Sequence, residues 1–326
     1  MVSIKAMVAA VVFSTTASAL PAPARMSPRQ AAESGAEGGQ NMDTTIAEFA
    51  RTLELAEGAF YKQVITQNEQ NRLFSEEEVD QMQKIFNTED AHATQLQQVL
   101  TAANGPIIKP CKYKFDTTDR NKILQTALVL EETGQAAYLG AAPLVQDKNT
   151  LALAGSILPV ESQHATVLRG LLKMDPVPRP FSNALSPADV STMVEPFIES
   201  CEDDTSNPLK LVPPNPQLQM QPAAEASGGA NRAANGENGP KFLRFSIASG
   251  GSEAAGGASE KAVSQTGNVN DAKFCAFPDG TSARFVNYAE PEGCQQPDDL
   301  VQPAMVMLTR EMDVSTVIAG PMPVPM

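Results

Sequence analysis

The sequence has no tryptophan, and aromatic residues make up only 5% of its 326 positions. A stacking platform for nucleic-acid bases or sugars is therefore not expected. Charged residues are also few, at 19%, and acidic side chains outnumber basic ones to give a formal net charge of -14. This balance argues against nucleic acid or an anionic membrane as a partner. Histidine is scarcer still, with two residues, but a hydrophobic fraction of 42% is enough to build a core.

Long hydrophobic runs are also missing. The apolar stretch from Ala6 to Phe13 is about half of the roughly 20 residues that a membrane span needs. Lys5 precedes it and Ala17-Ser18-Ala19 follows, which is typical of a secretory signal peptide cleaved after Ala19. We therefore expect residues 1–19 to be a signal peptide, with the mature protein secreted to the extracellular space or cell wall and no membrane span.

Composition divides the rest of the chain into four parts. Residues 20–43 are a flexible leader rich in proline, alanine, serine and glycine, and residues 44–202 have helical periodicity. Residues 203–270 are rich in proline, glycine, asparagine and serine, which predicts a low-complexity linker with one possible strand at Phe242–Ile247. Residues 271–326 contain short alternating runs, which predict a small β module.

The helical part predicts four long helices and a short fifth. Ser75 and Glu78 form a capping box that begins the second helix. Pro159 lies inside the fourth helix, where it should kink the helix or open a bulge. Ser186-Pro187 begins the fifth, which we expect to end near Cys201. The connections run short, long (residues 105–118) and short, as in ferritin-like four-helix bundles.

Four cysteines in an oxidising compartment predict two disulfides, for which three pairings exist. Cys111 lies in the long crossover and Cys201 just after the fifth helix, so a bridge between them would hold that helix on the bundle. Cys275 and Cys294 flank an Asp279-Gly280 hairpin turn in the β module. We therefore prefer the pairs Cys111–Cys201 and Cys275–Cys294 over the other two arrangements.

An internal repeat carries the candidate chemistry. The first and third helices share the pattern A-x-x-L-E-x4-A-x-Y, which contains Glu54 and Tyr61 in one and Glu131 and Tyr138 in the other. The second and fourth helices share E-x-x-H-A-T-x-L, and both histidines of the chain fall in this motif. One helical hairpin is therefore present twice.

On a helix, residues three apart share a face, so each E-x-x-H presents a carboxylate and an imidazole together. One glutamate from each of two helices plus E-x-x-H from the other two is the ligand set of di-iron and di-manganese carboxylate bundles. Counted from the loops at 1.5 Å per residue, the four motifs lie level with one another. The candidate metal ligands are Glu54, Glu89, His92, Glu131, Glu161 and His164.

The order of these motifs and the long crossover resemble the ferritin-like superfamily, which includes bacterioferritin, rubrerythrin and manganese catalase. More narrowly, residues 44–201 resemble the ferritin-like domain of fungal secreted stress-response and late-sexual-development proteins, akin to plant desiccation-related proteins. Phe274–Phe277 and Met307–Thr309 resemble the β extension of those fungal proteins.

The resemblance implies that the six candidates bind two iron or manganese ions, with Glu89 and Glu161 bridging them. It also places Tyr61 and Tyr138 beside the ligands, although tyrosines at such positions are more often core residues than redox relays. Without the resemblance, a single buried E-x-x-H is as often structural as metal-binding. Glu57 and Glu132 are expected on the surface or beside the ligands, because the repeat aligns Glu54 with Glu131.

Two functions of different class follow. The first is an oxidoreductase, catalase-like or ferroxidase-like, whose two metals act on peroxide or dioxygen in stress or development. The alternative is a non-catalytic structural or stress-protection protein of the cell wall, spore or extracellular matrix. A storage cage ranks third, because the linker and β module would crowd its shell. The sequence indicates neither the substrate nor whether the chain forms a homo-oligomer.

Overall fold

The computed structural model describes residues 42–204, 206–222, 241–248 and 268–325. The expected signal peptide and nearly all of the expected leader lie outside these residues. Among the described helices, none combines the length and hydrophobicity required to cross a membrane.

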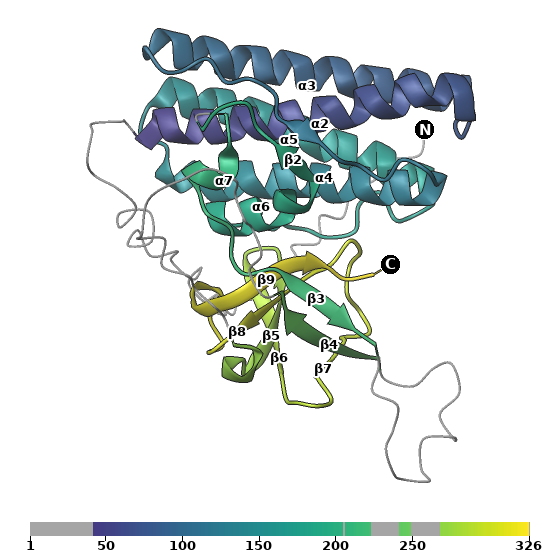
Figure 1. Cartoon of the computed structure of the whole chain (residues 1–326), viewed down its shortest axis with the longest axis vertical. Coiled ribbons are helices and arrows are strands. Elements are labelled where there is room, and N and C mark those ends of the chain that lie inside the picture. The colour runs from purple at the N-terminus through teal and green to yellow at the C-terminus, as the bar shows by residue number, and fades with distance from the viewer. Residues whose placement is uncertain (1–41, 205, 223–240, 249–267, 326) are drawn as a thin grey trace, which may run out of the picture.

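Four long helices lie side by side and form the upper part of the molecule in Figure 1. They are α2 (Met42–Asn71), α3 (Glu76–Ala102), α4 (Arg120–Ala141) and α5 (Lys148–Leu171). The α2–α3 and α4–α5 connections are short, and the latter contains the 3-10 turn η1 (Ala142–Leu144), whereas residues 103–119 form a long crossover. This is the ferritin-like arrangement that the sequence predicts.

Capping residues determine where three of these helices begin. Ser75 and Glu78 form the predicted capping box of α3, and the side chains of Asp119 and Asp147 accept backbone hydrogen bonds at the starts of α4 and α5. The helices pack through fully buried side chains such as Phe60 and Leu128.

The short fifth helix, α6 (Pro187–Val194), ends well before the predicted position near Cys201. It is followed by the 3-10 turn η2 (Glu195–Phe197) and the strand β2 (Ile198–Ser200), which pairs with β1 (Lys112–Tyr113) in the crossover. Pro196 explains the earlier end, because its ring clashes with the preceding turn and it has no N–H to donate.

The C-terminal region contains two antiparallel sheets (lower part of Figure 1). The first has the order β6-β5-β8-β9 and the second the order β3-β4-β7. Gly280, at the tip of the predicted hairpin between β5 and β6, has the positive φ of 61° that such a turn requires. The strands are β3 (Leu218–Gln221), β4 (Phe242–Ile247), β5 (Phe274–Asp279), β6 (Ser282–Asn287), β7 (Cys294–Gln295), β8 (Met305–Thr309) and β9 (Val317–Pro323).

The described parts of the expected linker include the predicted strand Phe242–Ile247, which is β4. They also contain three elements that the sequence does not predict: the short helix α7 (Pro208–Leu211), the strand β3, and most of the 3-10 turn η3 (Val269–Asp271). Leu218 of β3 and Phe245 of β4 are buried in the same cluster as the C-terminal strands. A four-residue strand is too short to show a period, so its order comes from pairing with β4 rather than from local sequence. Residues 223–240 and 249–267 lie outside the described residues.

The bundle and the sheets share buried side chains. Val190 and Met193 of α6, which lies between the two parts in Figure 1, cluster with Met305 and Met307 of β8 and with Phe49 of α2. Another 3-10 turn, η4 (Val314–Thr316), precedes β9, and partly buried Val314 packs on the same cluster. One hydrophobic cluster therefore extends from the bundle into the β region.

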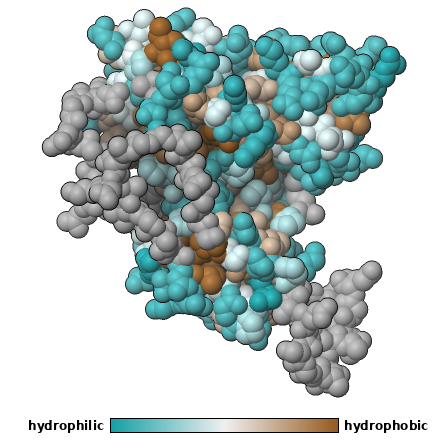
Figure 2. All heavy atoms as spheres, in the orientation of Figure 1, coloured by the Kyte–Doolittle hydropathy of each residue, from teal (hydrophilic) through white to brown (hydrophobic). Residues whose placement is uncertain are grey.

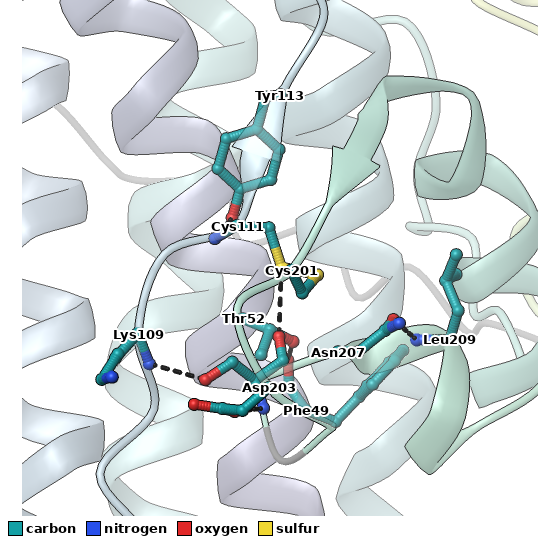
Figure 3. The surroundings of a disulfide bond; sticks show 10 residues. Phe49, Thr52, Lys109, Cys111, Tyr113, Cys201, Asp203, Asn207 and Leu209 are labelled. Atoms are coloured by element: carbon teal, nitrogen blue, oxygen red, sulfur yellow. Dashed lines mark hydrogen bonds between the residues drawn. A yellow bond between two sulfur atoms is a disulfide. The ribbon is translucent and has the colours of Figure 1, made fainter. Parts of the chain in front are cut away.

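Both predicted disulfides are present. Cys111–Cys201 joins the crossover to the segment after β2, beside Phe49 and Thr52 of α2 (Figure 3). The Cys111 sulfur also lies 3.2 Å from the carbonyl oxygen of Ser206. Cys275–Cys294 links β5 to β7 and so ties the two sheets together.

Candidate metal centre

The four long helices bring all six candidate ligands together in the bundle interior. Glu54 comes from α2, Glu89 and His92 from α3, Glu131 from α4, and Glu161 and His164 from α5. The four carboxylate residues are at most 1% exposed. The outer face of the bundle seen in Figure 2 is largely hydrophilic, so this acidic centre is enclosed by helices that keep polar surfaces toward solvent.

Two of the glutamates occupy equivalent positions in the two halves. Glu54 Oε2 lies 3.1 Å from His92 Nδ1, and Glu131 Oε2 lies 3.0 Å from His164 Nδ1. The second oxygen of each accepts a hydrogen bond from a tyrosine of the opposite half: Tyr138 donates to Glu54, and Tyr61 donates to Glu131. The tyrosines thus cross between α2 and α4 and fix one oxygen of each carboxylate.

The other two glutamates lie between the halves. Glu89 Oε2 is 3.2 Å from His92 Nδ1 and its Oε1 is 2.8 Å from His164 Nδ1, so this carboxylate reaches both imidazoles. Glu161 Oε1 lies 3.2 Å from His92 Nδ1. Ligand atoms within 4.8 Å of one another form two overlapping groups, and both groups contain Glu89 and Glu161. They are Glu54, Glu89, His92 and Glu161, and Glu89, Glu131, Glu161 and His164.

Three buried oxygens in this cluster accept no hydrogen bond of good geometry, although two of them lie within 3.2 Å of an imidazole nitrogen: Glu89 Oε1 and both oxygens of Glu161. A buried acceptor without a donor is costly, and a bound cation removes that cost. Among the described residues, no lysine or arginine forms an ion pair with these four glutamates. Carboxylate oxygens and imidazole nitrogens are donors that iron and manganese accept, so the residues fit a metal pair.

The pKa values reflect this concentration of carboxylates. Burial, followed by the charge of Glu131, raises the pKa of Glu89 to about 7. Burial by itself would lower the pKa of His92, but the carboxylates of Glu161, Glu54 and Glu89 outweigh it and raise the pKa to about 12. His164 follows the same pattern, with a pKa raised to about 10. In the metal-free chain the two imidazoles therefore serve as the counterions.

Thr88 orients His164. Its hydroxyl donates to the carbonyl of Ile85 at 2.6 Å, so at 2.8 Å it accepts from His164 Nε2. This leaves Nδ1 directed at the glutamates, as a metal ligand requires. The repeat places Val160 at the position equivalent to Thr88, and valine cannot accept such a bond, so the two histidines are held differently.

Glu57 and Glu132, for which the sequence predicts similar positions, have different surroundings in the structure. Glu132 is paired with Arg169 and, at 3.1 Å, with Arg179. Both side chains are buried, so a surface position is wrong for either; at Glu57, burial, followed by the charge of Glu161, raises the pKa well above the usual value. The i, i+3 spacing from Glu54, which places both on one helix face, is the sequence signal for this position.

Residues 42–174 match a family model described as a ferritin-like domain. Together with the four helices and the long crossover, this match defines the class: the helical part of the chain is a ferritin-like domain with a buried acidic and histidine cluster that could bind metal. No curated protein matches the chain.

Proposed function

We propose that this is a secreted ferritin-like protein whose bundle holds two iron or manganese ions and acts on peroxide or dioxygen. The observation that carries the proposal is the carboxylate of Glu89, which directs one oxygen toward each imidazole. Signal-like residues 1–19 and two disulfides support secretion.

Each residue has a defined role in this proposal. His92 with Glu54 would hold one ion, His164 with Glu131 would hold the other, and Glu89 and Glu161 would span both. Tyr61 and Tyr138 would keep one oxygen of Glu131 and Glu54 engaged and so orient the other. Four carboxylates balance the charge of two divalent ions without a lysine or arginine. When bound, such ions supply one-electron redox steps that side chains alone do not.

The carboxylate-rich donor set favours iron or manganese over zinc, which prefers fewer ligands in a tetrahedron. The helices that enclose the site would exclude bulk water from the reacting oxygen species. The resemblance of the sequence motifs to those of fungal stress-response proteins supports a role in stress or development.

The test is metal analysis of the full-length protein purified from culture medium, before and after supplementation with Fe²⁺ or Mn²⁺. We expect about two ions per chain, because the two groups of ligands overlap in a pair. His92→Ala and His164→Ala should each lose about one ion, and Glu89→Gln should weaken both. Glu77→Gln, at an exposed position of α3, is the control and should retain both ions.

Peroxide turnover by the loaded protein then separates the two classes of function. A loaded protein that consumes peroxide faster than free metal supports the oxidoreductase. A protein that stays metal-free after supplementation contradicts the proposal and leaves the structural or stress-protection role.

A further inference from the structure

The two halves of the bundle differ at one position in the interior. The repeat that aligns Glu54 with Glu131 and Tyr61 with Tyr138 also aligns Glu57 with Gly134. The first half therefore places a second carboxylate on the buried face of its helix, where the second half has no side chain at all.

The two aligned positions face each other. A Cβ atom added at Gly134 would lie 2.8 Å from Glu57 Oε1 and 3.0 Å from Glu161 Oε2. The carboxylate of Glu57 therefore occupies the space that the glycine leaves open, next to an oxygen of Glu161 that accepts no hydrogen bond. Glycine inside a helix costs roughly 0.5–1 kcal/mol relative to alanine, so helix stability does not favour it at this position.

Two carboxylates directed at one small region repel strongly in a buried site, so they are stabilised either by taking up a proton or by a cation between or beside them. Among the described residues, no ion pair joins Glu57 to a lysine, an arginine or a histidine. The charges that act on it are those of Glu161, Glu89, Glu54 and Glu131, all of them acidic.

We infer that Glu57 is an additional carboxylate ligand of the metal pair, admitted by Gly134, and that it makes the two metal positions unequal. The inference rests on the proposed function, since it needs a bound metal. It deepens that function by predicting an ion with one more carboxylate oxygen in its coordination shell than the repeat alone provides.

The experiment titrates the metal-free full-length protein with Mn²⁺ and follows binding by calorimetry. Wild type should bind two ions with different affinities. Glu57→Gln, which keeps the shape but loses the charge, should weaken one of them about 10-fold or more, since loss of even an outer partner of a ligand costs roughly 10–100-fold. Glu48→Gln is the matched control: it is also buried on α2, about 13 Å from Glu57 along the axis at 1.5 Å per residue.

Gly134→Ala tests the same geometry with every carboxylate kept. Its methyl group approaches the Glu57 carboxylate most closely, so it should weaken the same ion as Glu57→Gln; a displaced Glu161, which would span both ions, would weaken both instead. Its control is Gly155→Ala in α5, where an added Cβ meets nothing within 4 Å.

Co²⁺ provides a readout of coordination itself, because its visible absorption intensifies as ligands are lost. Glu57→Gln should increase that absorption relative to wild type and Glu48→Gln. If wild type binds two ions and Glu57→Gln matches Glu48→Gln in both affinity and absorption, Glu57 is not a ligand and only this inference falls. If wild type binds none, the proposed function falls with it. Circular dichroism of each variant establishes that it is folded.

Discussion

At the two imidazoles, burial lowers the pKa and the neighbouring carboxylates raise it, and the effect of the carboxylates is the larger. The pKa values of His92 and His164 stand at about 12 and about 10, so both are cationic at neutral pH in the metal-free chain. Protons and metal ions then compete for the same nitrogen atoms.

Metal binding at pH 7 should therefore release at least two protons per chain, one from each imidazolium, because a ligating nitrogen must be unprotonated. Glu89, with a pKa of about 7, should add a further fraction, and Glu161 and Glu57, whose pKa values burial raises well above the usual value, should add to the release as well. Apparent affinity should rise as the pH rises. Calorimetry in two buffers of different ionisation enthalpy measures the number released. Release close to zero would mean that the histidines are neutral before binding, contrary to the pKa values.

The six candidate ligands could be predicted from the sequence because each follows from a helical period that local residues determine. Glu57 was missed: its i, i+3 spacing from Glu54 places it on the same helix face, but its position in the interior also depends on the absence of a side chain at Gly134, on another helix. Thr88 was missed for a similar reason: its partner His164 is 76 residues away, and no local pattern joins them.

Among the elements, α6 connects the bundle to the sheets through a group of polar side chains as well as through its apolar face. Asp189 accepts hydrogen bonds from Ser186 at the start of the helix and from Asn215 Nδ2, which also donates to the carbonyl of Gly320 in β9. Burial raises the pKa of Asp189 to about 6, so the folded state disfavours its ionised form.

The sign of the resulting pH effect is fixed by that shift. Between pH 3.8 and about 6 the folded state binds the proton that the unfolded state has lost, so the free energy of unfolding falls as the pH rises. Relative to Asp189→Asn, which does not titrate, wild type should lose up to about 3 kcal/mol between pH 4 and 7 at 1.36 kcal/mol per pKa unit. Urea unfolding at both pH values measures this difference. Asp204→Asn, whose exposed carboxylate pairs with Lys210, should leave the pH dependence almost unchanged, and parallel curves for wild type and Asp189→Asn would refute the argument.

Two elements show where the local sequence no longer predicts the secondary structure. The cap at Ser186 predicts the start of α6 correctly, but the end depends on Pro196, and the predicted end near Cys201 lies beyond this proline. The strand β3 has only four residues, and its order comes from β4 across the intervening residues 223–240. Pairings of this kind are set by tertiary contacts and have no signature in one segment.

On the scale of the whole molecule, the sheets and the bundle are joined by a common hydrophobic cluster, and no disulfide connects them. Cys111–Cys201 lies within the helical part and its crossover, and Cys275–Cys294 lies within the β region. Coupling between the two therefore depends on buried side chains such as Met193 and Met307 and on the hydrogen bonds that Asn215 makes to both parts.

Met307→Ala, in β8, should lower the melting temperature of the helices as well as of the sheets, because its side chain packs in the cluster that includes α6. A buried Met→Ala change costs roughly 2–5 kcal/mol. The far-UV helical signal during heating measures the effect. Met312→Ala, at an exposed site near the end of the same strand, is the control and should change little. Two separate transitions, with only the sheet transition moved, would show that the parts unfold independently.

The Cys111–Cys201 bridge has a mechanical consequence. If the chain is pulled from its two ends, tension crosses the sulfur–sulfur bond and bypasses the 90-residue separation that it closes. Glu131, Glu161 and His164 lie inside this covalent loop, whereas Glu54, Glu89 and His92 lie on the part that carries the force. At about 3.5 Å per residue, a fully stretched oxidised chain should be shorter than one lacking this bridge by roughly 320 Å. Under load, one half of the candidate centre would be drawn away while the other half stayed within a closed loop.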